Sequence, residues 1–260
     1  MDTKLKTRYD IQYVSDLHLE AHSLDDNELK WWADVIIPSA KYLVLAGDIS
    51  PYDSPYLPLF LTWCKERFQK VIYVPGNHDY WSSNLSLKNL ESIDLLMGNL
   101  CDSLGIIFGQ KAVIKLDDQT PLILACTLWS PTPFFQCITL KEKNDYLHIK
   151  DFNIKAEQKI NRDHVKFLED HSEIQNGDDP IIVITHFSPS SVGTQPEEHA
   201  YRENKFFYVN DLNYLFSNKL IWIFGHTHLP LNFIKENTRL LSNPIGIPKE
   251  NLPYNKQALI

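Results

Sequence analysis

The sequence predicts an α/β protein built in four layers, α/β/β/α, with two mixed β-sheets packed face to face between outer helices. Two observations lead to this fold class. Short apolar segments rich in β-branched and aromatic residues end abruptly in polar clusters, as strands buried on both faces of a sheet do. The first three of these segments alternate with helical patterns, which indicates βαβ units and a mainly parallel sheet.

The expected elements follow this order along the chain. Five buried strands are expected, at residues 9–15, 42–46, 71–74, 181–184 and 220–224. Helices are expected at residues 25–35, 56–69, 85–97 and 154–170. Residues 106–116 and 121–129 resemble sequential strands, and residues 233–242 resemble an antiparallel pair. These later segments are the reason for expecting mixed sheets.

Length and composition favour one soluble domain over residues 1–260, with 43% hydrophobic residues and no apolar run near the roughly 18 residues of a membrane span. The net charge of −8 disfavours an extended nucleic-acid interface, but it allows a phosphate substrate if metal cations supply positive charge. Unpaired cysteines and the lack of a secretory signal favour the cytoplasm. Two polar excursions, at residues 130–165 and 189–205, are candidate lids.

Side chains suited to metal binding follow the five expected strands. They are Asp16 and His18, Gly47-Asp48, Gly76-Asn77-His78-Asp79, His186, and Gly225-His226-Thr227-His228. Each signal is weak alone, because Asp-x-His is common and a single histidine is more often a hydrogen-bonded core residue. Binding sites of α/β sheets gather at the carboxyl ends of strands, and glycine lets a backbone approach a buried site. The five motifs together therefore indicate one site.

In this order the motifs resemble the five-motif signature of calcineurin-like metallophosphoesterases, and they span residues 16–228. Residues 127–129 and 242–246 add similarity to small single-domain members of that superfamily. The resemblance implies one metal bound by Asp16, His18 and His228, and a second bound by Asn77, His186 and His226. It implies that Asp48 bridges the two metals. His78 would stabilise the transition state or protonate the leaving oxygen, with Asp79 orienting and charging its imidazole.

The implied reaction is hydrolysis of a phosphomonoester, a phosphodiester or a pyrophosphate by direct attack of a metal-bridging hydroxide. Mixed nitrogen and oxygen ligands suit manganese, iron or zinc. No subfamily pattern fits fully. Protein Ser/Thr phosphatases carry Asp-Arg after the second motif, where this chain has Ile49-Ser50-Pro51, and class III cyclic-nucleotide phosphodiesterases carry a second histidine where Phe187 stands. The monoester, diester and pyrophosphate alternatives stay open.

The expected partner is a small phosphorylated molecule, with nucleotide-like compounds among the candidates. Tyr80, Trp81, Trp129 and Phe187 could stack on a flat leaving group, although packing in the core explains each of them at least as well. The alternative from another class is a phosphoesterase fold kept as a scaffold for protein partners. The presence of His78 and of all seven implied ligands disfavours that alternative. A nuclease acting on long duplexes is disfavoured by the acidic charge.

Overall fold

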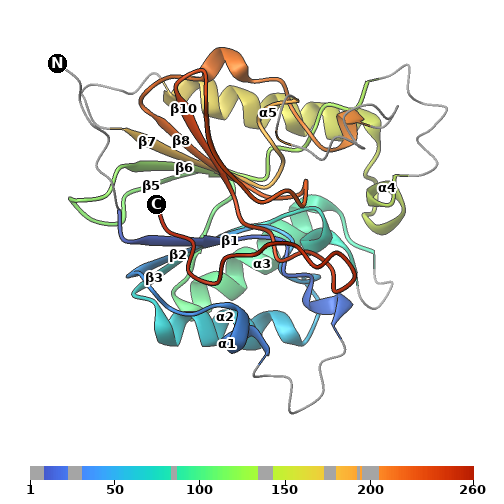
Figure 1. The fold of residues 1–260 in the computed structure, drawn as a ribbon. Coiled ribbons are helices and arrows are strands. Elements are labelled where there is room, and N and C mark those ends of the chain that lie inside the picture. The colour runs from blue at the N-terminus through green and yellow to red at the C-terminus, as the bar shows by residue number, and fades with distance from the viewer. Residues whose placement is uncertain are drawn as a thin grey trace.

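The computed structural model describes residues 9–22, 31–82, 87–133, 143–172, 180–191, 194 and 205–260. Two β-sheets lie face to face, and helices cover the outer face of each (Figure 1). This is the four-layer arrangement predicted from the sequence.

The first sheet has four strands in the spatial order β1, β2, β3 and β4. Their bounds are Ile11–Val14, Tyr42–Ala46, Lys70–Val74 and Ile107–Phe108. Neighbouring strands are parallel throughout, and the antiparallel contact of this sheet is a bridge that joins Gln12 to Leu259. The parallel order follows from the βαβ connections of its first three strands.

The second sheet has six strands in the order β5, β6, β7, β8, β10 and β9. Their bounds, in chain order from β5 to β10, are Ala112–Ile114, Leu122–Cys126, Ile181–Thr185, Leu220–Phe224, Leu231–Lys235 and Thr238–Ser242. The two outer pairs are antiparallel and the inner pairs are parallel, so this sheet is mixed.

Helices α1 (Trp31–Val35), α2 (Tyr56–Arg67) and α3 (Leu90–Leu104) cover the first sheet, and α5 (Ile154–Ser172) covers the second (Figure 1). The short α4 (Asp145–His148) precedes α5. Single 3-10 turns occupy Leu19–Ala21, His78–Tyr80, Lys205–Phe207 and Asn213–Leu215. Among the helices of the described residues, none is long and apolar enough to cross a membrane.

Both faces of the central strands are buried, which explains their continuous apolar sequence. In β2, Val44 packs between the sheets, while Leu43 and Leu45 pack against the helices of the first sheet. In β8, Ile223 packs between the sheets and Trp222 packs on the outer side. The rigid strands therefore hold their carboxyl ends in fixed positions.

The strand expected at residues 106–116 is divided between the two sheets. Its first part is β4 and its second part is β5. Gly109 lies at the division, and its amide donates to the carbonyl of Tyr73 at 2.8 Å. A Cβ at Gly109 would lie 2.7 Å from a methyl group of Val74, so glycine allows the chain to leave the first sheet here.

The two candidate lids are described only in part. Residues 134–142 of the first excursion and residues 192–193 and 195–204 of the second lie outside the described residues. The described part of the first excursion contains α4, which reaches the site described below.

Candidate metal centre

The candidate centre lies where strand ends from both sheets meet. The first sheet supplies Asp16 and His18 after β1, Asp48 after β2 and Asn77 after β3. The second sheet supplies His186 after β7, and His226 and His228 after β8. The sheets approach closely enough that a Cβ at Gly47 would lie 2.2 Å from Nδ1 of His186. Only glycine fits at this contact.

Five of these seven residues have a left-handed backbone. Their φ angles are 53° at Asp16, 45° at His18, 54° at Asp48, 65° at His226 and 51° at His228. Such conformations cost of order 1–3 kcal/mol each, and they persist where the surroundings fix them. Here the amides of Asp16 and His18 donate to the carbonyls of Gly47 and Asp48 at 2.9 and 3.0 Å. The amide of His226 donates to Oδ1 of Asp16 at 2.9 Å. The backbone is thus fixed with its side chains converging.

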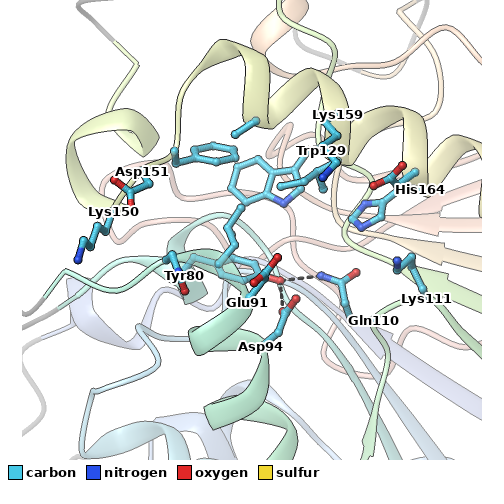
Figure 2. A pocket seen from close by; sticks show the side chains of 16 residues that line it. Tyr80, Glu91, Asp94, Gln110, Lys111, Trp129, Lys150, Asp151, Lys159 and His164 are labelled. Atoms are coloured by element: carbon cyan, nitrogen blue, oxygen red, sulfur yellow. Dashed lines mark hydrogen bonds between the residues drawn. The ribbon is translucent and has the colours of Figure 1, made fainter.

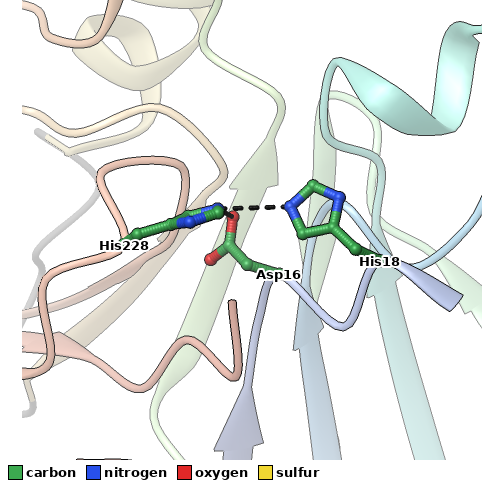
Figure 3. A group of neighbouring side chains, drawn as sticks. All are labelled: Asp16, His18 and His228. Atoms are coloured by element: carbon green, nitrogen blue, oxygen red, sulfur yellow. Dashed lines mark hydrogen bonds and ion pairs between the residues drawn. The ribbon is translucent and has the colours of Figure 1, made fainter. Parts of the chain in front are cut away.

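Asp16, His18 and His228 form the first cluster of possible ligand atoms (Figure 3). Nε2 of His18 lies 3.2 Å from Nε2 of His228, which lies 3.5 Å from Oδ1 of Asp16. Each histidine has a carboxylate at its other nitrogen, Glu20 at 3.1 Å for His18 and Glu250 at 2.7 Å for His228. If each Nδ1 donates to its carboxylate, both Nε2 atoms present lone pairs to the same point.

An atom of Asp16 also fits a cation. Oδ2 of Asp16 is buried and receives no hydrogen bond from any described residue. A buried carboxylate oxygen without a donor is costly unless a positive charge compensates it. The first cluster therefore has the composition and the unmet polarity of a metal site.

The second cluster combines Asp48, His186 and His226, with Asn77 beside them. Nδ1 of His186 donates to the carbonyl of Ala46 at 2.9 Å, which leaves the Nε2 lone pair free. That Nε2 lies 3.1 Å from Oδ1 of Asn77 and 3.3 Å from Oδ1 of Asp48. Three acceptors facing one another at these distances suit a shared cation.

Asp48 connects the two clusters. Its Oδ1 faces His186 in the second cluster, and its Oδ2 lies 3.8 Å from Nε2 of His18 in the first. Within each cluster the possible ligand atoms lie within 4.8 Å of one another. One carboxylate therefore offers an oxygen to each side.

The buried carboxylates make the centre attractive to cations. Burial lowers the pKa of His186, but the charge and hydrogen bond of Asp48, the charge of Asp16 and the hydrogen bond to Ala46 together raise that pKa to about 9. Burial also lowers the pKa of His228, whereas hydrogen bonds to Asp16 and Glu250 raise it to about 10. For His226, burial and the neighbouring His186 lower the pKa well below its usual value. Protons and metals compete for the same lone pairs, so this field favours bound cations.

His78 stands at the edge of the centre with 27% of its side chain exposed. Its amide donates to Oδ1 of Asp48 at 2.8 Å, and its Nδ1 lies 3.2 Å from Oε1 of Glu20. Its ring stacks on the indole of Trp81, with centroids 3.6 Å apart. This arrangement leaves Nε2 of His78 available to a substrate.

Comparison with known proteins identifies the family. Residues 11–230 match the family model described as calcineurin-like phosphoesterase. The chain belongs to this family. The phosphoesterase is 29% identical over 270 residues to uncharacterized protein L509 of Acanthamoeba polyphaga mimivirus. The alignment covers 96% of this chain and 95% of that protein.

A second relative is [acyl-carrier-protein] phosphodiesterase PptH of Mycobacterium tuberculosis, 32% identical over 80 residues, or 29% of this chain and 24% of that protein. The crystal structure of phosphopantetheinyl hydrolase (PptH) from the same organism has the same fold, with a TM-score of 0.75 and 18% identity over 97% of this chain and 96% of that chain. Membership of this family makes the chain a hydrolase of phosphoric esters. The scaffold alternative is not favoured.

Asp79 is expected from the sequence to orient His78, but in the structure its carboxylate is bonded to backbone amides. Its carboxylate accepts four backbone hydrogen bonds, from the amides of Asp48, Ile49, Ser50 and Gly76 at 2.7–2.9 Å. Among the described residues, Glu20 is the carboxylate bonded to the His78 ring. Asp79 therefore joins the turns after β2 and β3, and the expectation that it orients His78 is wrong.

The four aromatic residues expected at the substrate offer no open ring face. Tyr80, Trp129 and Phe187 are at most 1% exposed. Tyr80 and Trp129 line a separate cavity of about 350 Å³ between α3 and α5 (Figure 2), where the Tyr80 hydroxyl donates to Asp94 at 2.6 Å. Phe187 packs against the ring of His226, with centroids 4.1 Å apart. These three are core residues, which corrects the expectation that they contact substrate.

Trp81 is covered on both faces. His78 and His148 both stack on its indole, with centroids at 3.6 and 4.5 Å and interplanar angles of 26° and 18°. Two rings so close to one centroid would overlap on a single face, so they lie on opposite faces. Trp81 supports His78 and offers no face to a flat leaving group.

Three acidic residues beside the centre were missed by sequence reasoning. Glu20 and Glu250 contact the ligand histidines, and Asp145 contacts Asn77. Glu20 lies two residues after His18, and this spacing could have suggested it. Glu250 and Asp145 follow no expected strand, so no local signal marks them.

Proposed function

We propose that this phosphoesterase is a two-metal phosphodiesterase that hydrolyses a small diester directly. The observation that carries the proposal is the pair of ligand clusters joined through Asp48, whose two oxygens face opposite clusters. The proposed ligands of one metal are Asp16, His18 and His228, and those of the other are Asn77, His186 and His226. Because both sheets contribute to each metal, we propose that residues 1–260 act as one domain.

The donor set indicates the class of metal. Four imidazoles, two carboxylates and one amide suit manganese, iron or zinc better than calcium or magnesium. When bound, such a pair supplies Lewis acidity, which lowers the pKa of water and neutralises charge on the phosphoryl oxygens. The protein residues then only orient the substrate and supply a proton.

His78 is proposed as the proton donor to the leaving oxygen. Glu20 holds Nδ1 of His78, which leaves Nε2 directed away from that contact. Trp81 covers one face of the imidazole and limits its rotation. A donor fixed in this way needs little reorganisation during the reaction.

The preference for a diester is supported by the PptH relative, which is named a phosphodiesterase and aligns over 80 residues at 32% identity. A nucleotide base has no open aromatic face among the four residues expected to receive it. We also propose a cytoplasmic location, supported by three free cysteines, Cys64, Cys101 and Cys126, that are buried thiols.

The test uses metal-stripped protein with manganese, iron or zinc added singly, and compares bis(p-nitrophenyl) phosphate with p-nitrophenyl phosphate. We expect metal-dependent turnover, faster on the diester, and a loss of at least about 100-fold in Asp48→Asn. Asp170→Asn, at an exposed ion pair with Lys166, is the matched control that keeps full activity. Faster turnover of the monoester would reject the diester preference, and absence of metal binding would reject the proposal.

A further inference from the structure

Asp145 of α4 contacts both a proposed metal ligand and the support of the proposed proton donor. Its Oδ1 accepts from Nδ2 of Asn77 at 3.0 Å and from Nε1 of Trp81 at 3.0 Å. Asp145 is 4% exposed and lies 68 residues after Asn77 along the chain. Two donors from the segment after β3 thus share one buried oxygen from a distant element.

The contact decides which atom of Asn77 faces the metals. A side-chain amide has one acceptor and one donor group, and either could point into the centre. A carboxylate can only accept, so Asp145 selects the NH₂ group and turns Oδ1 of Asn77 toward His186, 3.1 Å from its Nε2. With the amide reversed, a donor would face the metal.

Other groups hold Asp145 in this position. The ammonium of Lys143 lies 3.7 Å from Oδ2 of Asp145 and is also paired with Glu157, and both side chains are at most 5% exposed. This pairing compensates the buried charge of Asp145. In the same four-residue helix, His148 stacks on the face of Trp81 opposite His78.

We propose that Asp145 is a positioning residue of the metal centre, which orients the Asn77 amide and the Trp81 indole so that one presents its oxygen to the metals and the other supports His78. The inference rests on the proposed function, in which Asn77 is a metal ligand. Outer carboxylates that orient ligands typically contribute about 10–100-fold to metal affinity.

The test is calorimetric titration of metal-stripped protein with Mn²⁺. We expect two sites in the wild-type protein and, in Asp145→Ala, about 10–100-fold weaker binding at one of them. Asp94→Ala is the matched control, since it also removes a carboxylate that accepts a buried donor, the Tyr80 hydroxyl. It should bind Mn²⁺ as the wild type does. Unchanged binding in Asp145→Ala would overturn the inference, whereas a wild type without Mn²⁺ sites would overturn the proposed function itself.

An exchange of the two side chains separates positioning from a general effect on folding. Asn77→Asp alone places two carboxylates about 3 Å apart, and Asp145→Asn alone cannot satisfy Lys143 and Asn77 together. In the double variant, the amide introduced at position 145 can donate to the carboxylate introduced at position 77 and accept from Lys143. Its Mn²⁺ binding should therefore be tighter than in either single variant. The single variant Asp145→Asn and the double variant both lose the contact with Trp81, so that loss does not affect their comparison. If Asp145 had a merely structural role, the losses of Mn²⁺-binding free energy in the two single variants would add up in the double variant, and this result would reject the proposal.

Discussion

At the scale of single residues, glycines set how closely the backbones approach at the centre. A Cβ on Gly76 would lie 2.3 Å from Oδ1 of Asp48 and 2.4 Å from its backbone nitrogen. A Cβ on Gly225 would lie 2.7 Å from Oδ2 of Asp16. No side chain can be added at either position without moving a carboxylate of the centre.

Gly76→Ala should therefore displace Asp48 and weaken Mn²⁺ binding at both sites by at least about 10-fold, as loss of a shared ligand orientation does. Gly98→Ala is the matched control, because Gly98 lies within α3 and its nearest neighbour would be 3.7 Å from the new Cβ. Gly98→Ala should raise the free energy of unfolding by about 0.5–1 kcal/mol. Titration calorimetry and urea unfolding measure both effects, and normal Mn²⁺ binding in Gly76→Ala would contradict the argument.

Glu20 and Asp79 should respond differently to loss of charge. Glu20→Gln weakens the contacts to the rings of His18 and His78, so turnover should fall about 10–100-fold with little change in unfolding free energy. Asp79→Asn leaves backbone amides without an acceptor, so it should lower the unfolding free energy by about 1–3 kcal/mol. Steady-state kinetics and urea denaturation distinguish them. If Asp79→Asn lowered turnover without lowering the unfolding free energy, the result would favour the role expected from the sequence, in which Asp79 orients His78.

The sequence predicts the residues that converge better than it predicts their partners. Asp16, Asp48 and His186 follow buried strands, and such positions meet at one edge by topology alone. Asp145 reaches the same place through a loop and a short helix, where no periodic pattern operates. Asp79 was paired with His78 because the two are adjacent in the sequence. On the 3-10 turn that they share, adjacent side chains point in different directions, and Asp79 accepts from backbone amides instead.

At the scale of elements, α5 is attached to the second sheet by a buried histidine. Nδ1 of His164 accepts a hydrogen bond from the amide of Leu128 at 3.1 Å. Burial, with a smaller contribution from the charge of Lys111, lowers the pKa of His164 from 6.5 to about 3. The imidazole is therefore neutral in the folded protein at neutral pH.

This lowered pKa predicts a pH dependence of stability. Below pH 6.5 the unfolded chain binds a proton at His164 that the folded chain binds only near pH 3, so stability is full above pH 6.5 and falls as pH decreases through that window. The loss approaches about 1.4 kcal/mol per pH unit, or about 2 kcal/mol at pH 5. His164→Asn can keep the acceptor without titrating. Urea unfolding of the wild type and of His164→Asn, in chelator at pH 7.5 and 5, measures how much unfolding free energy each protein loses. Equal losses in the two proteins would contradict the prediction.

The boundary between β4 and β5 shows what periodicity cannot reveal. Residues 106–116 resemble one strand in the sequence, yet the chain changes sheets at Gly109. Both halves are apolar because both sheets bury residues on their facing sides. Which sheet a short segment joins depends on tertiary pairing, and a single-sequence pattern does not contain that information.

At the scale of the whole molecule, each proposed metal joins the two sheets. His228 from the second sheet lies with Asp16 and His18 from the first, and His186 lies with Asp48 and Asn77. Metal binding should therefore stabilise the packing of one sheet on the other as well as the site.

Free Mn²⁺ at 100 times the dissociation constant of a site should stabilise the fold by about 2.7 kcal/mol for each site that it occupies. For a chain of this size, each occupied site corresponds to a rise in Tm of about 5–10 °C. Asp48→Asn should show a much smaller rise because it loses a shared ligand. Differential scanning calorimetry with chelator or with Mn²⁺ provides the measurement, and an equal rise in both proteins would place the bound metal elsewhere.

The order of the proposed ligands along the chain has a consequence for synthesis on the ribosome. Residues 16–77 supply four ligands early, but each metal also requires one histidine from the turn after β8, His226 or His228. Neither site is complete until the ribosome has added those residues, and the two sites then become complete within two residues of each other. Metallation is therefore expected late in synthesis, when most of the chain has been made and β9 and β10 are the strands still to follow.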